Sequence, residues 1–302
     1  MPSKPEYDAV VSKDVMVKMH DGTLLATDIY RPSRKGKVPE ERFPTVLMIT
    51  PYNKEDPVRA RDVGEWFCKR GYVVVIQDFR GRFKSEGIFY KYANMGEDGY
   101  ETVEWIAKQR WSNGKIGTIG HSYMAHFQIA VACLSPPHLS AMIVVEGGFS
   151  NAFFSSCRHM GAFEIRQLVW TFTAAANSRE AACNPAIRTA LESVNPADYL
   201  DPTREPLKEG ETPLSLVPPY ERFYFDMLTK SEYTEYWRKI GLCAEEYYDA
   251  AADVPTLLIG GWYDPNARLT SDIYVGLSKR KKGPIRLIFG HWIHGWQYLE
   301  ST

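Results

Sequence analysis

The 302-residue sequence has no uninterrupted apolar stretch long enough to cross a bilayer. Its first residues, from Met1 to Asp14, are polar and mixed in charge, so they lack the apolar segment of a signal peptide. The sequence also lacks an excess of one charge, because 36 basic and 37 acidic residues give a formal net charge of −1. This balance argues against a broad attraction for nucleic acid or for an anionic membrane, and we expect neither as a partner.

Cysteine is scarce, and the five cysteines are odd in number and scattered. They are Cys68, Cys133, Cys157, Cys183 and Cys243. No pair has the spacing of metal ligands, so we expect reduced thiols in a cytoplasmic protein and no metal site. Internal repeats and low-complexity tracts are also absent from the sequence.

The pattern of apolar residues changes near Pro44. Before it, apolar and polar residues alternate from Val15 to Arg31 on either side of Asp21-Gly22, a pair that favours a hairpin turn. After it come short apolar runs typical of buried parallel strands, at Thr45–Thr50, Tyr72–Ile76, Lys115–Ile119, Ala141–Val145, Thr256–Ile259 and Ile285–Phe289. Helical stretches lie between them, at Val58–Arg70, Glu97–Gln109, Ser122–Cys133 and Arg268–Arg280. We therefore predict an antiparallel hairpin followed by a parallel sheet covered by helices on both faces.

Residues 149–245 interrupt this alternation, because they are rich in Ala, Glu and aromatic residues and contain no run typical of a buried strand. We expect a mainly helical cap inserted after the fourth parallel strand, above the carboxyl edge of the sheet. Ligands bind along that edge in open α/β sheets. The predicted catalytic domain comprises residues 1–148 and 246–302, and the cap comprises residues 149–245.

Three residue types that cooperate in nucleophilic catalysis follow predicted strands. Ser122, in Gly120-His121-Ser122, lies between a strand and a helix, which is the setting of a nucleophile elbow. Asp264 and His294 follow the last two predicted strands. This order of serine, acid and histidine is that of the α/β-hydrolase fold. The imidazole takes the serine proton and the carboxylate orients the imidazole, so we predict a catalytic triad.

Each of these residues also has a structural interpretation. Asp264 could cap the helix that begins near Arg268, and His294 could be a packed histidine. The joint occurrence of the three residue types at strand ends, in this order, favours the triad over either alternative.

Five short motifs follow one another along the chain. They are Asp78-Phe79-Arg80-Gly81 with Ser85-Glu86-Gly87, Trp111-Ser112-Asn113-Gly114-Lys115-Ile116-Gly117, Gly120-His121-Ser122-Tyr123, Gly261-Trp262-Tyr263-Asp264 and Gly290-His291-Trp292-Ile293-His294. In this order they resemble the family that contains cocaine esterase, the X-Pro dipeptidyl-peptidases and the α-amino-acid ester hydrolases. The resemblance implies an α/β-hydrolase with a helical cap, and it favours His294 over His291 as the base.

The resemblance also implies an oxyanion hole made by the Tyr52 hydroxyl and the Tyr123 amide. Tyr52 follows the predicted strand Thr45–Thr50, which ends at the same sheet edge as Ser122. The alternative for Tyr52 is an aromatic residue of a surface loop. We expect a small-molecule acyl substrate for this chain, and the resemblance implies no metal or organic cofactor.

The chain departs from the family pattern at its C-terminal side. Family members usually continue past the catalytic histidine into a β-rich jelly-roll domain, whereas this sequence stops at Thr302. A missing domain would expose apolar surface, which self-association into a homo-oligomer could cover.

Aromatic residues are frequent in the predicted cap, and most of them must form its own core. Phe149, Phe153 and Trp170 are the candidates for an acyl pocket, because they combine proximity to the sheet edge with helical spacing. Glu146 follows a strand beside the elbow. It could attract a substrate ammonium, or it could be a solvated or locally bonded carboxylate.

The primary prediction is a carboxylic-ester hydrolase that works through an acyl-enzyme. An acyltransferase or cyclase would use the same residues with an acceptor other than water, and a product assay with a competing nucleophile distinguishes it. An X-Pro dipeptidyl-peptidase would need an acidic site for the free amine of its substrate, for which Glu146 is the candidate. A non-catalytic binding protein on a hydrolase scaffold is the remaining alternative, and the intact set of serine, acid and histidine argues against it.

Overall fold

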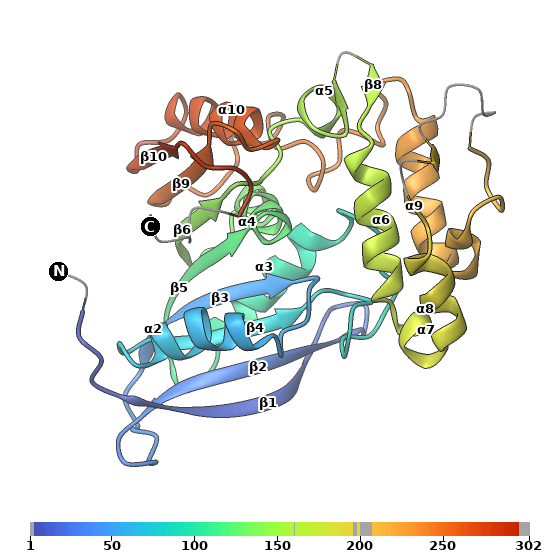
Figure 1. The fold of residues 1–302 in the computed structure, drawn as a ribbon. Helices are drawn as coiled ribbons and strands as arrows, with labels where there is room; N and C mark the ends of the chain where they lie inside the picture. The colour runs from blue at the N-terminus through green and yellow to red at the C-terminus, as the bar shows by residue number, and fades with distance from the viewer. Residues whose placement is uncertain (1–2, 160, 196–197, 200–206, 296–302) are drawn as a thin grey trace.

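Eight strands form the central sheet, which Figure 1 shows in the computed structural model of the protein. The structure describes residues 3–159, 161–195, 198–199 and 207–295. The strands are β1 (Asp8–Lys18), β2 (Leu24–Ser33), β3 (Phe43–Thr50), β4 (Val73–Asp78), β5 (Ser112–His121), β6 (Leu139–Val145), β9 (Thr256–Gly261) and β10 (Ile285–Gly290). Their order across the sheet is β1-β2-β4-β3-β5-β6-β9-β10.

The hairpin and the parallel sheet that the sequence predicts are both present. β1 and β2 are antiparallel, with Lys18 opposite Leu24, and the chain turns between them through Asp21-Gly22. Gly22 has a φ of +89°, which glycine adopts at no steric cost. β2 is also antiparallel to β4, whereas the strands from β4 to β10 across the sheet are mutually parallel.

Alternate residues of the parallel strands enter two separate cores, as the two-residue period of a strand requires. Val73 and Val75 of β4 belong to the larger core, whereas Val74 and Ile76 belong to the smaller one. The predicted sheet with both faces covered is therefore confirmed.

The larger core lies between the sheet and three helices, which are α3 (Met95–Ala107), α4 (Tyr123–Leu134) and α10 (Ala267–Ser278), and it continues into the segment between β6 and β9. Helix α4 is buried from Tyr123 to Cys133, because it contacts β3, β5, β6 and α3. The smaller core lies under α1 (Pro57–Arg59), a π-helical stretch (Ala60–Glu65) and α2 (Trp66–Cys68). No helix in the described ranges is long and apolar enough to cross a membrane.

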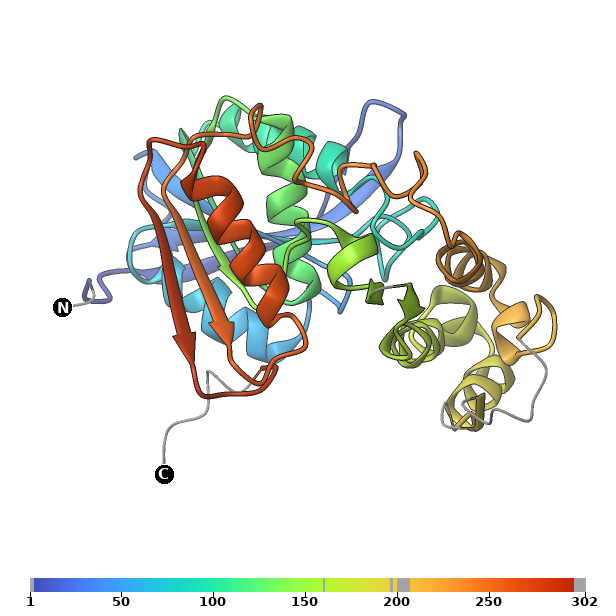
Figure 2. The ribbon, with the colours of Figure 1, turned by 90° about the horizontal axis from the view of Figure 1, so that it is seen from above.

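The segment between β6 and β9 forms most of a second layer beyond one end of the sheet (Figures 1 and 2). Its helices are α5 (Ala152–Ser155), α6 (Arg166–Ala176), α7 (Arg179–Cys183), α8 (Pro185–Glu192) and α9 (Pro218–Thr229), with a 3₁₀ turn at Pro213–Leu216 and a short hairpin of β7 (Arg158–His159) and β8 (Ala162–Phe163). Arg82, which follows β4, donates hydrogen bonds to the Ala174 carbonyl on α6 and to the Tyr220 hydroxyl on α9. These bonds tie the helical segment to the carboxyl end of the sheet.

A buried ion-pair network holds the loop that follows β3. The ammonium of Lys54 is fully buried and donates to Asp28 at 2.7 Å and to Asp14 at 2.6 Å. Burial lowers the pKa of Lys54, but the hydrogen bonds to Asp14 and Asp28 outweigh it, so the pKa is raised overall. The Lys54 amide also donates to the carboxylate of Asp78 at 2.7 Å. The network therefore fixes the backbone next to Tyr52, two residues before Lys54.

We expect Lys54→Met to lower the free energy of unfolding by about 3–5 kcal/mol, because it leaves the buried carboxylate of Asp28 without its cation. Lys84→Met is the matched control, since Lys84 pairs with Asp14 and Glu55 but is 46% exposed. Lys84→Met should lower the free energy of unfolding by no more than about 1 kcal/mol. Urea denaturation measures the free energy of unfolding of both variants. An equal decrease in the two would contradict the assignment of a buried ion pair between Lys54 and Asp28.

Candidate active site

Ser122 occupies a sharp turn between β5 and α4. Its backbone has φ +59° and ψ −121°, a strained conformation for a residue with a side chain, and its amide donates to the Val145 carbonyl at 2.8 Å. Two glycines make this turn possible. A Cβ on Gly120 would lie 2.4 Å from the Met124 carbonyl oxygen, and a Cβ on Gly147 would lie 2.4 Å from the Ser122 carbonyl oxygen. The sequence prediction of a nucleophile elbow matches this geometry.

The last two strands bring an acid and an imidazole to this serine. Nε2 of His294 lies 2.9 Å from the Ser122 hydroxyl oxygen, and Nδ1 lies 2.9 Å from Oδ2 of Asp264. An ionised carboxylate only accepts hydrogen bonds, so Nδ1 carries the proton and Nε2 is free to accept one from the serine. The other oxygen of Asp264 accepts the Asn266 amide at 2.6 Å, which fixes the buried carboxylate. The side chain of His294 is 33% exposed.

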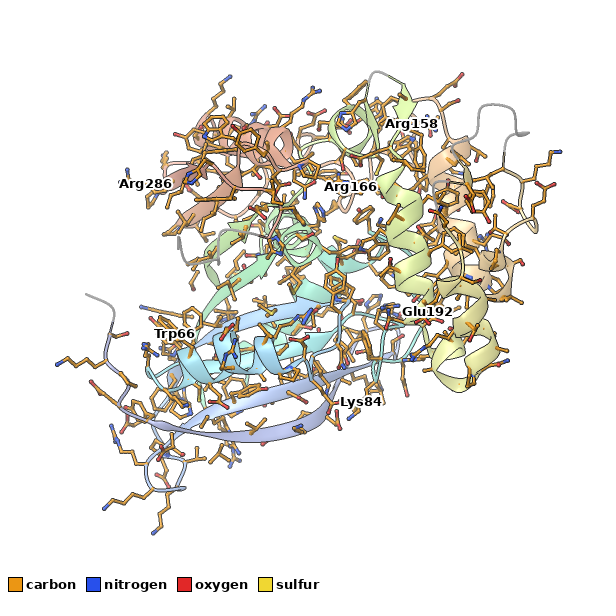
Figure 3. All side chains as sticks on the ribbon, viewed as in Figure 1. Trp66, Lys84, Arg158, Arg166, Glu192 and Arg286 are labelled. Carbon is orange, nitrogen blue, oxygen red and sulfur yellow. The ribbon has the colours of Figure 1, made fainter. Side chains whose placement is uncertain are left out.

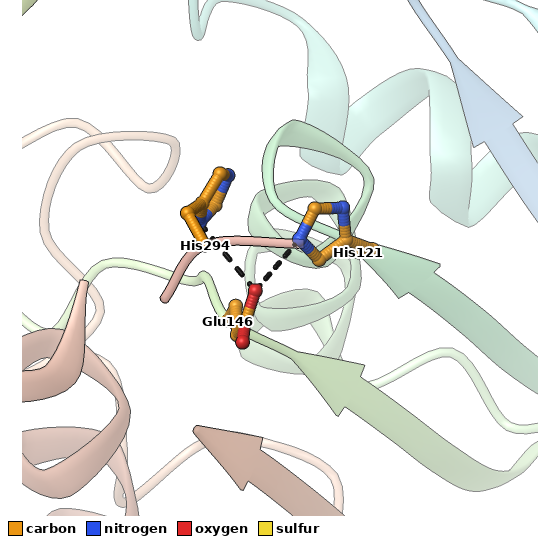
Figure 4. A group of neighbouring side chains, drawn as sticks. All are labelled: His121, Glu146 and His294. Carbon is orange, nitrogen blue, oxygen red and sulfur yellow. Dashed lines mark hydrogen bonds and ion pairs between the residues drawn. The ribbon is translucent and has the colours of Figure 1, made fainter. Parts of the chain in front are cut away.

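A second carboxylate lies beneath the same imidazole (Figure 4). Glu146 follows β6 with a φ of +49°, and its buried carboxylate is 2.9 Å from Nε2 of His121 and 3.5 Å from Nδ1 of His294. The same oxygen accepts the Gly295 amide at 2.7 Å. Glu146 therefore anchors the segment that carries His294, and it adds negative charge next to the imidazole.

The side chains of His121, Glu146 and His294 also form the one group among the described residues that could hold a metal ion, with ligand atoms within 4.8 Å of one another. In the present geometry these atoms already form hydrogen bonds, between His121 and Glu146 and between His294 and Asp264. A metal on Nδ1 of His294 would displace Asp264 from that nitrogen. We therefore interpret the group as a hydrogen-bonded network.

The two predicted oxyanion donors lie next to the serine. The Tyr123 amide is the first of α4, and such an amide has no acceptor within its own helix. The Tyr52 hydroxyl accepts a hydrogen bond from the Trp170 indole at 3.0 Å. Burial raises the pKa of Tyr52, while hydrogen bonding to Trp170 and to Ser122 opposes this rise. Tyr52 therefore remains a protonated donor at neutral pH, beside the nucleophile.

A cleft of about 400 Å³ opens between the Tyr52 loop and helix α6. Its lining includes the guanidinium groups of Arg82 and Arg166, the indole of Trp170 and no carboxylate. Arg166, labelled in Figure 3, bridges Glu164 and the Asn266 side chain. Arg166 is thus paired with a carboxylate, whereas Arg82 donates to the neutral carbonyls of Pro51 and Ala174, so Arg82 gives the cleft its net positive charge.

Three of the four side chains predicted to bind substrate do not line this cleft. The ring of Phe149 stacks on that of His126, with 3.9 Å between the ring centroids. Phe153 packs on Trp237 inside the cap. Neither phenylalanine lines the 400 Å³ cleft. The Glu146 side chain is turned under His294, because its backbone adopts φ +49°. Only Trp170 lines the cleft as expected.

Sequence reasoning also missed residues that matter here. Lys54 supports the Tyr52 loop, and His121 pairs with Glu146. Asp28, an acidic residue directly before the apolar Ile29 in strand β2, was the available signal for a buried cation.

Comparisons with known proteins agree with this architecture. A family described as X-Pro dipeptidyl-peptidase (S15 family) matches residues 21–296. Cocaine esterase from Rhodococcus sp. (strain MB1 Bresler) is 29% identical over 306 residues, which cover 94% of this chain and 49% of that protein. The chain thus spans about half the length of this curated relative. The family resemblance inferred from the five motifs is confirmed.

Solved structures establish the fold. An aminopeptidase from the marine sediment archaeon Thaumarchaeota archaeon superposes with a TM-score of 0.69 at 22% identity, covering 98% of this chain and 50% of that one. An α-amino acid ester hydrolase superposes with a TM-score of 0.67 at 20% identity, with the same coverage of 98% and 50%. The predicted α/β-hydrolase fold is confirmed.

We expect Gly120→Ala to lower the free energy of unfolding by about 1–3 kcal/mol, because the new methyl group would overlap the Met124 backbone. Gly117→Ala is the matched control on the same strand, since the nearest atom to its Cβ is 3.7 Å away. It should leave stability unchanged within about 1 kcal/mol. Urea denaturation compares the two variants, and an equal response would show that the turn at Ser122 is not sterically constrained.

Proposed function

The chain belongs to the X-Pro dipeptidyl-peptidase (S15) family, and we propose that it is a serine hydrolase that cleaves small-molecule carboxylic esters. The observation that best supports this proposal is the continuous chain Ser122–His294–Asp264, in which both hydrogen bonds are 2.9 Å long. A serine hydroxyl becomes an effective nucleophile when an oriented imidazole accepts its proton. These three side chains have that arrangement.

In the acylation half of the proposed reaction, the Ser122 hydroxyl attacks the ester carbonyl while its proton moves to Nε2 of His294. The imidazolium is stabilised by Asp264 and by the nearby charge of Glu146. The tetrahedral oxyanion accepts hydrogen bonds from the Tyr52 hydroxyl and the Tyr123 amide. When the carbon–oxygen bond to the alcohol breaks, His294 returns the proton to the departing oxygen.

In the deacylation half, water takes the place of the alcohol. His294 removes a proton from water as the oxygen attacks the acyl-enzyme, and the same two donors stabilise the second oxyanion. Collapse of that intermediate breaks the bond to Ser122, which recovers its proton from His294. The products are one carboxylic acid and one alcohol.

The charges around the site favour an ester over an X-Pro dipeptide as substrate. A dipeptidyl-peptidase must pair the ammonium at the N-terminus of its substrate with an acid. Glu146, the candidate from the sequence, is buried and bonded to His121 and to the Gly295 amide. Among the described residues that line the cleft, Arg82 is a cation bonded to neutral carbonyls and none is acidic, so an ammonium would be repelled there.

Hydrolysis of p-nitrophenyl butyrate tests the proposal. The wild-type protein should release nitrophenolate in a burst that is stoichiometric with enzyme, because the acyl-enzyme accumulates. Ser122→Ala should abolish both the burst and the turnover. The control Ser278→Ala removes an exposed hydroxyl at the end of α10 and should leave both unchanged. Turnover that survives in Ser122→Ala would contradict the proposal.

We expect Tyr52→Phe to lower kcat for the same ester by about 10²–10³, because one of two oxyanion donors is lost. KM should change little, since the donor acts on charge that develops in the transition state. Tyr90→Phe is the matched control, because the Tyr90 hydroxyl bonds to Asp226 outside this cleft. If both variants had the same kcat as the wild-type enzyme, Tyr52 would not be an oxyanion donor.

A further inference from the structure

A second, smaller cavity of about 50 Å³ lies behind the cleft, on the far side of Trp170 and Arg166, which line both. The cavity is also lined by Lys91, Tyr92, His126, Ser156, Gln167 and Asn266. One water molecule occupies about 30 Å³ in the liquid, so the cavity has room for a group of a few atoms. Its size suits a functional group of a substrate rather than a whole ligand.

Lys91 is buried in this wall without a counter-ion. It is 3% exposed, and its ammonium donates one hydrogen bond, to the neutral side-chain carbonyl of Gln167 at 2.7 Å. The nitrogen lies 3.9 Å from the centre of the Trp170 ring. No carboxylate of the described residues is within ion-pair distance of it, although an ammonium has three N–H groups to satisfy.

Two further groups in the wall are donors without acceptors. Nδ1 of His126 accepts the Gly148 amide at 2.8 Å, and burial lowers the pKa of this histidine well below its usual range. The ring is therefore neutral and carries its proton on Nε2, which has no acceptor among the described residues. The hydroxyl of Ser156, also buried, makes no hydrogen bond within the described ranges. The described lining of the cavity therefore combines N–H and O–H donors with the side-chain amides of Gln167 and Asn266, whose oxygens already accept hydrogen bonds from Lys91 and Arg166, and it includes no carboxylate.

The charged and titratable groups around Lys91 do not neutralise the positive charge of its ammonium. The pKa of Lys91 is lowered to about 7, chiefly by burial and also by the charge of Arg166, whereas Cys157 and Glu164 oppose the shift. Burial also raises the pKa of Cys157 to about 12, so this thiol is neutral. The carboxylate of Glu164 is already paired with Arg166 at 2.9 Å. An anion that entered the cavity would supply the missing charge and would favour the protonated lysine.

The cavity is coupled to the reacting centre through one side chain. The Trp170 indole that lies against Lys91 donates its N–H to the Tyr52 hydroxyl, the proposed oxyanion donor. A group bound by Lys91 is therefore separated from the oxyanion hole by a single indole ring.

From this arrangement we infer that the cavity is a carboxylate subsite, and that the enzyme acts on esters that carry a second, free carboxylate. Lys91 forms the ion pair, and His126 and Ser156 donate to the carboxylate oxygens. The inference rests on the proposed ester hydrolysis and specifies its substrate class.

Three esters test the inference. Mono-p-nitrophenyl glutarate carries the carboxylate on its acyl chain, 4-valeryloxybenzoate carries it on the leaving alcohol, and p-nitrophenyl valerate is neutral. The wild-type enzyme should prefer one of the charged esters. Lys91→Met, which keeps the length of the side chain and removes the charge, should lower the kcat/KM ratio of that ester to the neutral one by about tenfold or more.

Lys239→Met is the matched control, because Lys239 also lies over an aromatic ring, Tyr236, but lines a different groove. It should leave the ratio unchanged. A ratio that Lys91→Met does not alter for either charged ester would overturn the inference, whereas the hydrolysis of all three esters would still support the proposed function.

Binding to an inactive protein separates the two proposals. Calorimetry on Ser122→Ala should detect glutarate binding that is lost in the double variant with Lys91→Met. The binding should weaken and take up protons as the pH rises from 6 to 8, because the free lysine loses its charge through a pKa of about 7. If the wild-type protein cleaves none of the esters, the proposed function fails, and the calorimetry alone decides the subsite. In that case, the absence of Lys91-dependent binding would overturn it.

Discussion

The turn at Ser122 determines the position of every other group in the site. A serine with φ +59° can be held there only because Gly120 and Gly147 leave room for the backbone of α4 and of the turn itself. β5 and α4 fix this turn, and the parallel order of the sheet then positions the acid and the imidazole. The carboxyl ends of β9 and β10 lie beside it, so Asp264 and His294 reach the serine through hydrogen bonds of 2.9 Å.

Opposite charges surround this centre on two sides. Asp264 and Glu146 lie next to the imidazole of His294, where they stabilise the proton that it gains during the proposed reaction. On the side of the cap, Arg82, Arg166 and Lys91 line the cleft and the cavity behind it. In the proposed reaction, this polarity would stabilise the imidazolium on one side and attract the proposed anionic substrate on the other.

Much of the fold follows from the sequence, because short apolar runs and an Asp-Gly turn depend on local patterns. The α/β-hydrolase fold and the family are confirmed, and the catalytic roles of Ser122, Asp264 and His294 remain predictions that the geometry supports. For Glu146 the sequence left open a contact with a substrate ammonium or a locally bonded carboxylate, and the structure shows it bonded to His121 and to the Gly295 amide. Lys91 gave no signal, because its burial depends on Gln167, 76 residues away.

Labelling with an active-site fluorophosphonate, located by mass spectrometry of the digested protein, tests the central claim most directly. The account predicts one adduct per chain, on the peptide that contains Ser122, and its loss in both Ser122→Ala and His294→Ala. Labelling that persists in His294→Ala at the wild-type rate, or no labelling of the folded wild-type protein, would contradict a serine activated by this histidine.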